Sequence, residues 1–312
     1  MSKSIFSAPH FNDEAAAYAY VEARLWANGR VCPHCGVVGQ SGMLKGKSNR
    51  LGLRKCYACR KPFSVKVGTI FEGSHIAMRD WLTAIQLICS GKKGISSNQL
   101  HRTLGITLKS AWFMSHRIRE AMAPAKNAGP LGGPGEVVEA DELYTGHKKG
   151  WKKPRAGFAH KMAVVSLVER GGRARSFHLA ECPDALTVTN LVTANISPGS
   201  RLHTDESHLY REMKGHIAKH EKVNHSRKEY ARGDVTTNSV EGYFSVFRRG
   251  MIGTYQHVSE QHLQRYLAEF DFRQSNRAKL GVTDDMRAVR LLKGTEGKRL
   301  TYRTTGGNRC GA

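Results

Sequence analysis

The sequence predicts a multidomain protein that combines a small metal-binding unit, a helical region and a C-terminal α/β domain with a mixed sheet. Two Cys-x-x-Cys pairs lie within the first 60 residues. Helix-period runs follow between residues 75 and 123, and strand-like and helix-like runs follow a Gly/Pro-rich stretch at 126–135. We therefore expect an N-terminal helix with a metal-binding ribbon over 1–70, a helical region over 71–130, an α/β domain over 131–280, and a basic, mobile tail over 281–312.

The charge of the chain points to a polyanionic partner. Lys and Arg number 49 against 26 Asp and Glu, which gives a net charge of +23 over 312 residues. Nucleic acid is the first candidate and an anionic membrane surface the second. A basic surface without any catalytic role is also compatible with this charge. Hydrophobic residues make up 40% of the chain, which excludes a disordered basic tail. No apolar run is long enough to span a membrane, and the first ten residues lack a signal core, so we expect a cytoplasmic protein.

The first predicted elements are a helix and a cysteine-rich ribbon. Residues 13–27 have helical spacing, with Asp13 as a cap. Short strand-like runs follow at Arg54–Tyr57 and Pro62–Val67. Twenty residues separate the two Cys-x-x-Cys pairs, and four thiolates in this spacing favour one closed structural Zn²⁺ site without a catalytic role. The expected ligands are Cys32, Cys35, Cys56 and Cys59. The basic residues between the pairs suit DNA phosphates, although a ribbon that binds protein is the alternative.

The helical region has the outline of a helix-turn-helix motif. A helix is predicted over Met78–Cys89, a short one over Ser96–Leu104 and a longer basic one over Leu108–Met122. The last two are joined by Gly105–Thr107, a turn that contains glycine. An ordinary small helical bundle is the alternative.

The α/β domain is predicted from three strands followed by alternating helices and strands. The strand-like runs are Val137–Leu143, Lys161–Glu169, Ala174–Leu179, Ser200–Thr204 and Lys222–His225, and the helix-like runs are Asp184–Asn195, Ser207–His220, Asn238–Arg249 and Glu260–Asn276. A hairpin at Gly171-Gly172 argues for an antiparallel part, and the later alternation argues for a parallel part. This order fits the ribonuclease H fold, and other α/β folds remain open.

Three carboxylates lie at positions where α/β folds often carry catalytic residues. Asp141 and Asp205 end predicted strands, and Glu241 lies in a predicted helix. Two Asp and one Glu suit two Mg²⁺ or Mn²⁺ ions, which promote phosphodiester chemistry. Taken singly, each acid has an ordinary structural role available, such as a turn, a helix cap or a solvated helix position. Their order on these elements favours a shared metal site.

Longer motifs give the chain a family resemblance. It resembles bacterial insertion-sequence transposases of the ISXO type, through CPHCG at Cys32–Gly36, VEADELYTG at Val138–Gly146, HTD at His203–Asp205, TNSVEGYFSVFRRGMIGTY at Thr237–Tyr255 and YLAEFDFRQSNR at Tyr266–Arg277. Thirty-five residues separate Asp205 from Glu241, as in the D-D-35-E pattern of integrases and transposases. The resemblance implies a zinc ribbon joined to a DDE integrase core of ribonuclease H fold.

The resemblance places the first two metal ligands on Asp141 and Asp205, whereas the third remains open. Asn238 and Glu241 both match the relevant stretch and share one helical face, and Glu241 is preferred for its charge and spacing. Arg248 stands where the family usually has Lys, which keeps the positive charge but changes how it grips phosphate.

The acids beside Asp141 and two histidines near the expected site have weaker assignments. Glu139 points to the same strand face as Asp141, as a supporting acid or a solvated one, and Glu142 is its other acidic neighbour. His203 and His225 are expected to be structural rather than proton shuttles.

A basic loop follows Asp141 closely. It interleaves basic residues with a Trp, which suits DNA backbone contacts and stacking on a base. The residues expected to bind DNA are Lys148, Lys149, Trp151, Lys152, Lys153 and, further along, Arg249. A solvated hairpin tip is the alternative.

Together these features predict a DDE transposase. The resemblance implies that it binds the terminal inverted repeats and target DNA, cleaves each transposon end with two Mg²⁺ ions, and transfers the freed 3′-hydroxyl. It also implies a homodimer or larger assembly and a location at the bacterial nucleoid. The rivals are a zinc-ribbon regulator with an inactive α/β domain and a ribonuclease H-like nuclease acting on RNA or hybrids.

Overall fold

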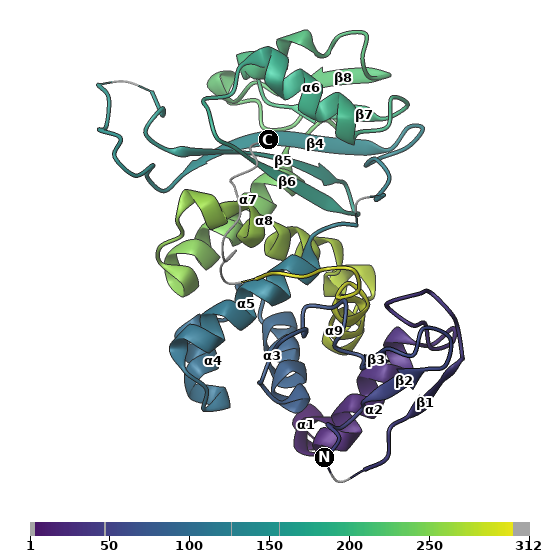
Figure 1. Ribbon diagram of the computed structural model, residues 1–312. Coiled ribbons are helices and arrows are strands. Elements are labelled where there is room, and N and C mark those ends of the chain that lie inside the picture. Colours follow the sequence, from purple (N-terminus) through teal and green to yellow (C-terminus); the bar gives the residue numbers. More distant parts are fainter. Residues whose placement is uncertain (1–3, 47, 126, 156, 302–312) are drawn as a thin grey trace. The chain divides into compact units, whose positions relative to one another are not determined.

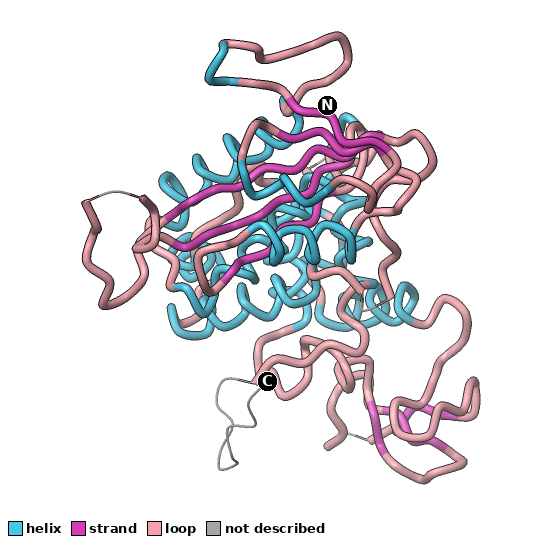
Figure 2. The backbone as a smooth tube through the Cα atoms, turned by 90° about the horizontal axis from the view of Figure 1, so that it is seen from above, coloured by secondary structure: helices cyan, strands magenta, loops and turns pink. Residues whose placement is uncertain are grey.

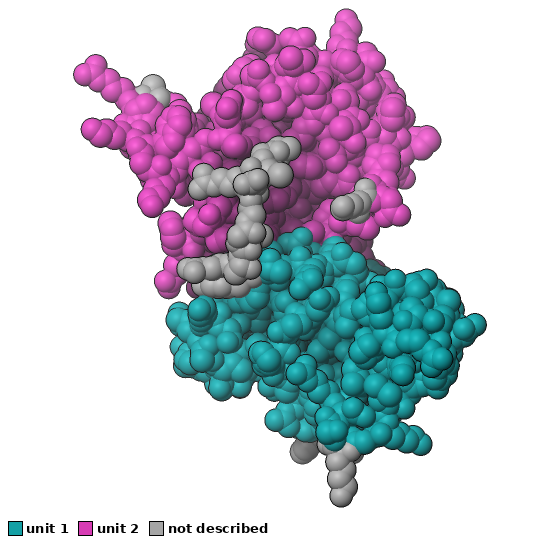
Figure 3. Space-filling view, viewed as in Figure 1, with its two compact units in different colours: residues 1–90, 95–122, 284–312 teal, residues 91–94, 123–283 magenta. Residues whose placement is uncertain are grey.

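The computed structural model of the chain describes residues 4–46, 48–125, 127–155 and 157–301. The backbone divides into two units, which Figure 3 colours separately. Unit 1 comprises residues 1–90, 95–122 and 284–312, and unit 2 comprises residues 91–94 and 123–283. The chain therefore enters and leaves unit 2 through unit 1.

Unit 1 begins with helices and a small antiparallel sheet. Its first elements are η1 (Ile5–Ser7), α1 (Pro9–Asn12), α2 (Glu14–Leu25), β1 (Ser41–Met43), β2 (Arg54–Cys56) and β3 (Pro62–Phe63), labelled in part in Figure 1. Asp13 caps α2 as predicted, because its carboxylate accepts a hydrogen bond from the Ala16 amide at 2.7 Å. The sheet order is β1-β2-β3. The predicted run Pro62–Val67 is strand only at its first two residues, because turns begin at Val65.

Four further helices complete unit 1: α3 (Met78–Ser90), α4 (Ser97–Leu104), α5 (Leu108–Met122) and α9 (Asp284–Lys293). Helix α4 begins with a capping box between Ser96 and Gln99 and ends at Gly105, whose φ of 64° is left-handed. Helix α5 follows after Thr107, so the two helices and their turn lie where the sequence predicts them.

Helix α9 differs from the prediction of a basic, mobile tail over residues 281–312. It packs against α3, and Arg287 donates a hydrogen bond to the Cys89 carbonyl. Its buried residues Ala288, Leu291 and Leu292 repeat at helical spacing, but the surrounding Arg and Lys residues obscure that pattern. The last part of the predicted tail, residues 302–312, lies outside the described residues.

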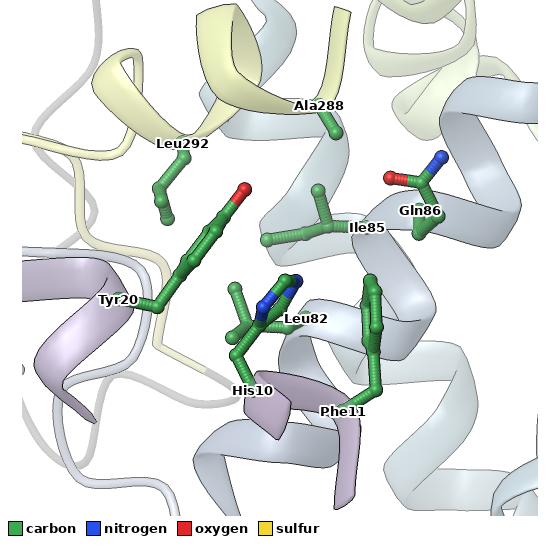
Figure 4. Close-up of a pocket in the computed structure, with 8 residues that line it drawn as sticks. All are labelled: His10, Phe11, Tyr20, Leu82, Ile85, Gln86, Ala288 and Leu292. Atoms are coloured by element: carbon green, nitrogen blue, oxygen red, sulfur yellow. The ribbon is translucent and has the colours of Figure 1, made fainter. Parts of the chain in front are cut away.

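A small pocket in unit 1 reflects core packing rather than a ligand site. Figure 4 shows the rings of His10 and Tyr20 facing one another, with a ring separation of 3.9 Å. The lining residues come from α1, α2, α3 and α9: His10, Phe11, Tyr20, Leu82, Ile85, Gln86, Ala288 and Leu292. The volume of about 10 Å³ holds about one water molecule, so it has no room for a ligand.

Unit 2 is built around a five-stranded mixed sheet. Its strands are β4 (Val137–Thr145), β5 (Met162–Glu169), β6 (Ala174–Leu179), β7 (Arg201–Thr204) and β8 (Lys219–Lys222), in the spatial order β6-β5-β4-β7-β8. Strands β4, β5 and β6 pair antiparallel, while β4 with β7 and β7 with β8 pair parallel. The predicted division into antiparallel and parallel parts is confirmed, and Figure 2 shows the strands side by side.

Helices cover both faces of this sheet. The helical elements are α6 (Ala185–Asn195), η2 (His208–Met213), η3 (His225–Arg227), α7 (Asn238–Gly250), η4 (Met251–Tyr255), α8 (Glu260–Ser275) and η5 (Ala278–Leu280). Val138 and Ala140 of β4 pack toward α6 and η2, whereas Leu143 packs toward α7 and α8. Odd-numbered residues of β4 therefore face α7, and even-numbered residues face α6 and η2.

In unit 2, residues 207–225 differ from their predicted structure. The sequence predicts a helix over Ser207–His220 and a strand over Lys222–His225. The structure instead has only the short helix η2, followed by β8, which pairs in parallel with β7. Gly215 has a φ of 88°, a left-handed conformation that a helix cannot continue through. His225 begins the short helix η3 rather than ending a strand.

Within the described ranges, no helix is both long enough and apolar enough to cross a membrane.

Candidate active site and cysteine cluster

The candidate active site lies just past the point where the pairing of two parallel strands ends. Strand β7 pairs with β4 only as far as the Glu139–His203 pair, while β4 continues along β5 to Thr145. Asp141 follows this point on β4, and Asp205 is the first residue after β7. The two aspartates, which are far apart in sequence, therefore meet beside the carboxyl end of β7.

Three carboxylates gather at this place. Ligand oxygens of Asp141, Glu142 and Asp205 all lie within 4.8 Å of one another. Asp141 Oδ1 accepts from the Glu142 amide at 2.7 Å, and Asp205 Oδ1 accepts from the Ser207 amide at 2.9 Å. Each aspartate thus keeps a second oxygen outside these local hydrogen bonds.

Glu142 is a member of this cluster that sequence reasoning did not place there. Strand alternation puts its side chain on the face opposite Asp141, so it received no role. Its Oε1 nevertheless accepts from the hydroxyl of Ser207, a residue that lies beyond the end of β7, at 2.8 Å. The available signal was an acid directly after Asp141 in an acid-poor chain.

The cluster has the electrostatics of a site built for cations. Burial, then Glu142 and Asp205, raise the pKa of Asp141 to about 8. Burial also raises the pKa values of Glu142 and of Asp205. The charge of Asp205 raises the pKa of Glu142 further. Like charges held this close in a half-buried place are unfavourable without a neutralising group.

The chemistry of these side chains fits a hard divalent cation. Carboxylate oxygens are the ligands that Mg²⁺ and Mn²⁺ prefer. Glu142 Oε2 is buried beside the Tyr210 hydroxyl, which lowers the pKa of Glu142. A cation would relieve the repulsion among the carboxylates that raises the Asp141 pKa.

Glu241 lies near this cluster but outside its 4.8 Å group. It is the fourth residue of α7, and it contributes to raising the Asp141 pKa, so the two carboxylates interact. Its Oε1 accepts from the Thr237 hydroxyl at 2.7 Å and lies 3.5 Å from His225 Nε2. Its side chain is 47% exposed, which leaves it room to move toward a ligand.

His225 contacts Glu241 and interacts electrostatically with Asp205. Besides its contact with Glu241, it lowers the pKa of Asp205. The adjacent Glu206 holds it in place by accepting hydrogen bonds from the His225 amide at 2.8 Å and the Ser226 amide at 3.0 Å. The structural role expected for His225 therefore includes direct contact with the site.

Asn238 and Arg248 share α7 with Glu241, and both side chains are exposed. The charge of Glu241 helps to raise the pKa of Asp141, whereas Asn238 is the first residue of the helix. Arg248 and Arg249 both lie in the last turn of α7, at its solvent-facing side.

The four predicted zinc ligands converge in unit 1. The sulfur atoms of Cys32, Cys35, Cys56 and Cys59 all lie within 4.8 Å of one another. The Cys32–Cys59 and Cys35–Cys56 sulfur separations are both 3.7 Å. A tetrahedral Zn²⁺ with Zn–S bonds of about 2.3 Å has edges of about 3.8 Å, whereas a disulfide bond is about 2.05 Å long. The cluster therefore fits a zinc ribbon.

The basic loop between β4 and β5 extends beyond the sheet (Figure 1). Lys149, Lys152 and Lys153 are exposed, as is Trp151 with 58% of its surface accessible. Lys148 differs from the prediction of a DNA contact. It is buried, and its ammonium donates to the Ala180 carbonyl, so it secures the base of the loop.

The same loop carries a second exposed aromatic residue that the sequence argument passed over. The Phe158 ring stacks on Tyr144 of β4 with ring centroids 4.8 Å apart, and Lys161 Nζ lies 5.3 Å from its centre. Phe158 is 52% exposed. Exposed rings beside ammonium groups are typical of surfaces that bind nucleic-acid bases.

Comparison with known proteins agrees with both sites. Residues 12–62 match the transposase zinc-ribbon domain, and residues 130–275 match the ISXO2-like transposase domain. The chain is 28% identical over 267 residues to a protein in transposable element ISH50 of Halobacterium salinarum, an alignment that covers 80% of this chain and 86% of that protein. The first match contains the cysteine cluster, and the second contains the carboxylates. The chain therefore belongs to the insertion-sequence transposases that join a zinc ribbon to an ISXO2-like DDE transposase domain.

Proposed function

We propose that this transposase cleaves DNA at the ends of its own insertion element and joins the freed ends to target DNA in a divalent-metal-dependent reaction. The observation that carries the proposal is the gathering of Asp141, Glu142 and Asp205 beside the carboxyl end of β7. The chain has a net charge of +23, so a cluster of carboxylates in it needs an explanation. Divalent cations bound between these carboxylates and the DNA phosphates would provide one.

Asp141, Asp205 and Glu241 are the metal ligands in this proposal, and Glu142 is a further ligand or a direct support. Divalent cations held there promote attack on a phosphodiester and stabilise the leaving oxygen. Asp141 and Asp205 each offer an oxygen that local hydrogen bonds leave available. Glu241 is preferred over Asn238 because its charge acts on Asp141.

The reaction needs no covalent bond to the protein. In cleavage, water attacks the phosphodiester at the transposon end and a 3′-hydroxyl leaves. In strand transfer, that hydroxyl attacks a target phosphodiester, one P–O bond forms and another breaks. The protein's residues position the two DNA substrates and the cations, and Arg248 would contact donor or target phosphate.

The sheet order supports assignment of the core to the ribonuclease H fold. Three antiparallel strands, then two parallel ones beside the first strand, are the arrangement expected for that fold. The acids lie on β4 and after β7, the two strands that meet at its centre. The active-site positions and the topology thus support the same proposal.

Recognition of the element's ends is assigned to the zinc ribbon and to α4 and α5. The first turn of α5, with Leu108 and Lys109 exposed, is the part that would enter the major groove. The loop with Lys149, Trp151, Lys152 and Lys153 would hold DNA close to the carboxylates, with Arg249 as a further contact. Synapsis of two ends requires at least a homodimer.

A strand-transfer assay with Asp205→Asn tests this function. The substrate is a labelled duplex that carries the element's terminal inverted repeat, with Mg²⁺ or Mn²⁺ and a supercoiled target. Asp205→Asn keeps the side-chain size but removes a ligand charge, and we expect at least a 1,000-fold loss of cleavage with unchanged DNA binding.

The matched control is Glu212→Gln, which removes an exposed acid paired with Arg211 on the same unit. Its activity should stay within twofold of wild type. Equal activity of the Asp205→Asn variant and wild type would refute the catalytic assignment and leave a DNA-binding regulator. Preferential cleavage of RNA or hybrids, without protection of specific DNA ends, would point to a nuclease instead.

A further inference from the structure

Helix α7, which carries Glu241, begins without a cap of its own. The residue before it, Thr237, makes no side-chain hydrogen bond to the helix backbone. The Thr237 hydroxyl donates to Glu241 instead. The first amides of a helix need acceptors, and here a local residue does not supply them.

Glu139, on strand β4, supplies those acceptors from a distance of 100 residues in the sequence. Its Oε2 accepts from the Ser239 amide at 2.6 Å and from the Val240 amide at 3.1 Å. Its Oε1 accepts from the Ser239 hydroxyl at 3.0 Å. These amides belong to the second and third residues of α7, the positions that an ordinary N-cap side chain serves.

Arg170, just after β5, completes the arrangement. It donates to Glu139 Oε1 from Nε at 3.1 Å and from Nη2 at 2.9 Å. It also donates to the Asp234 carbonyl at 2.8 Å and to the Thr236 hydroxyl at 3.1 Å. The same guanidinium therefore holds both the capping carboxylate and the segment that leads into α7.

The site requires a carboxylate rather than an amide. The Glu139 side chain is fully buried, and its two oxygens accept hydrogen bonds from Arg170, Ser239 and Val240. A glutamine in its place would turn an NH₂ group toward one of these donors. The negative charge also faces the positive end of the α7 dipole and the Arg170 guanidinium, which both favour it.

We propose that Glu139 is a positioning residue, a cap supplied by the catalytic strand that fixes Glu241 relative to Asp141. The inference rests on the proposed function, because it gives the carboxylates their role. Glu139 and Asp141 are two residues apart on the same face of β4, about 7 Å along the strand. Glu241 follows the capped amides within one helical turn. One side chain thus sets the spacing between the two ends of the metal site.

The test compares Glu139→Gln with wild type in the full-length, zinc-loaded chain. Manganese binding is measured by the electron paramagnetic resonance of free Mn²⁺, with Asp205→Asn defining the sites that belong to the cluster. We expect Glu139→Gln to weaken this binding about 10- to 100-fold, the usual effect of losing a group that orients metal ligands. Amide exchange at Ser239 and Val240 should also become faster, while binding of inverted-repeat DNA stays within twofold.

The matched control is Glu169→Gln on the neighbouring turn. Glu169 also pairs with an arginine, Arg173 at 2.7 Å, and also accepts from a backbone amide, that of Gly132 at 2.7 Å. Its bonds do not reach α7, so it reports general destabilisation alone. If Glu139→Gln unfolds, Arg170→Lys is measured instead, since it keeps the charge but loses the guanidinium fork.

Unchanged Mn²⁺ binding in the Glu139→Gln variant, or an equal loss in Glu169→Gln, would overturn the proposal. Unchanged exchange at Ser239 and Val240 would overturn it as well. Failure of the proposed function can be told apart from failure of the Glu139 proposal. If the proposed function were wrong, wild type itself would show no Mn²⁺ site that depends on Asp205. Amide exchange reports the cap independently of that result.

Discussion

Asp141 is more costly to ionise in the folded protein than in the unfolded chain. Its pKa is raised to about 8, so between about pH 4 and pH 8 the folded state binds more protons than the unfolded state. The free energy of unfolding of the protein without bound divalent cations therefore falls as pH rises through this range. A bound cation removes this penalty, which links the stability of the site to its occupancy.

Asp141→Asn tests that linkage. Relative to wild type without added Mg²⁺ or Mn²⁺, the variant should gain stability progressively from pH 5 to pH 8, since it has no charge to bury. Urea denaturation at several pH values measures the difference. Added Mn²⁺ should stabilise wild type but not the variant.

The control for this series is Asp184→Asn at the cap of α6. Burial is not the main influence on the Asp184 pKa, which hydrogen bonds from Thr187 lower, so both its folded and unfolded forms are ionised above pH 5. The stability difference between Asp184→Asn and wild type should stay constant over the same range. A constant difference for Asp141→Asn too would contradict the raised pKa.

At the scale of elements, local sequence signals correctly predict α4, α5 and the turn between them. The capping box at Ser96 and Gln99 starts α4, and Gly105 ends it in a left-handed conformation with a φ of 64°. An added Cβ at Gly105 would meet no atom within 4 Å. The need for glycine is therefore conformational rather than steric.

Gly105→Ala should destabilise unit 1 by about 1 kcal/mol, because alanine disfavours the left-handed region. Thermal unfolding followed by circular dichroism measures the change. Gly242→Ala is the contrasting variant, since Gly242 lies inside α7 and its added Cβ also meets no atom within 4 Å. It should stabilise the protein by about 0.5–1 kcal/mol. A stabilising effect at Gly105 would contradict the proposed turn.

Other elements depended on packing that local patterns do not reveal. Residues 207–220 have apolar spacing compatible with a helix. The left-handed Gly215 instead interrupts the helical path, and pairing with β7 places Lys219 and His220 in β8. Helix α9 is basic enough to resemble a tail, yet its Leu291 and Leu292 are buried. In both cases tertiary contacts outweigh local propensity.

For the whole molecule, the net charge of +23 predicts DNA binding that depends strongly on salt. If the protein contacts 6–10 phosphates, raising the salt concentration from 50 to 200 mM would lower its affinity for DNA about 10³- to 10⁵-fold. Replacing Lys149, Lys152 and Lys153 together by Ala should reduce the slope of log K against log salt by about 2.7, or 0.9 for each lost phosphate contact. Fluorescence anisotropy with inverted-repeat DNA measures this slope.

Arg211→Ala provides the comparison for the loop variant, because Arg211 is exposed on η2 and already paired with Glu212. Its slope should match wild type. A loop variant with the wild-type slope would show that the three lysines do not contact phosphate in the complex.

The sequence by itself determined the parts of this protein whose signals are local. The spacing of Cys32, Cys35, Cys56 and Cys59 specifies a four-sulfur cluster, and the longer motifs carry the family. Strands β4, β5 and β6 and helices α3, α4, α5, α7 and α8 follow from periodicity and caps.

Only the tertiary structure decided which acids work together. Glu142 joins Asp141 and Asp205, and it accepts a hydrogen bond from Ser207, which lies beyond the end of β7. Glu139, on the face that alternation predicted, caps α7 rather than entering the acid cluster. Both outcomes depend on where distant strands and helices end in space, and alternation along one strand carries no information about that.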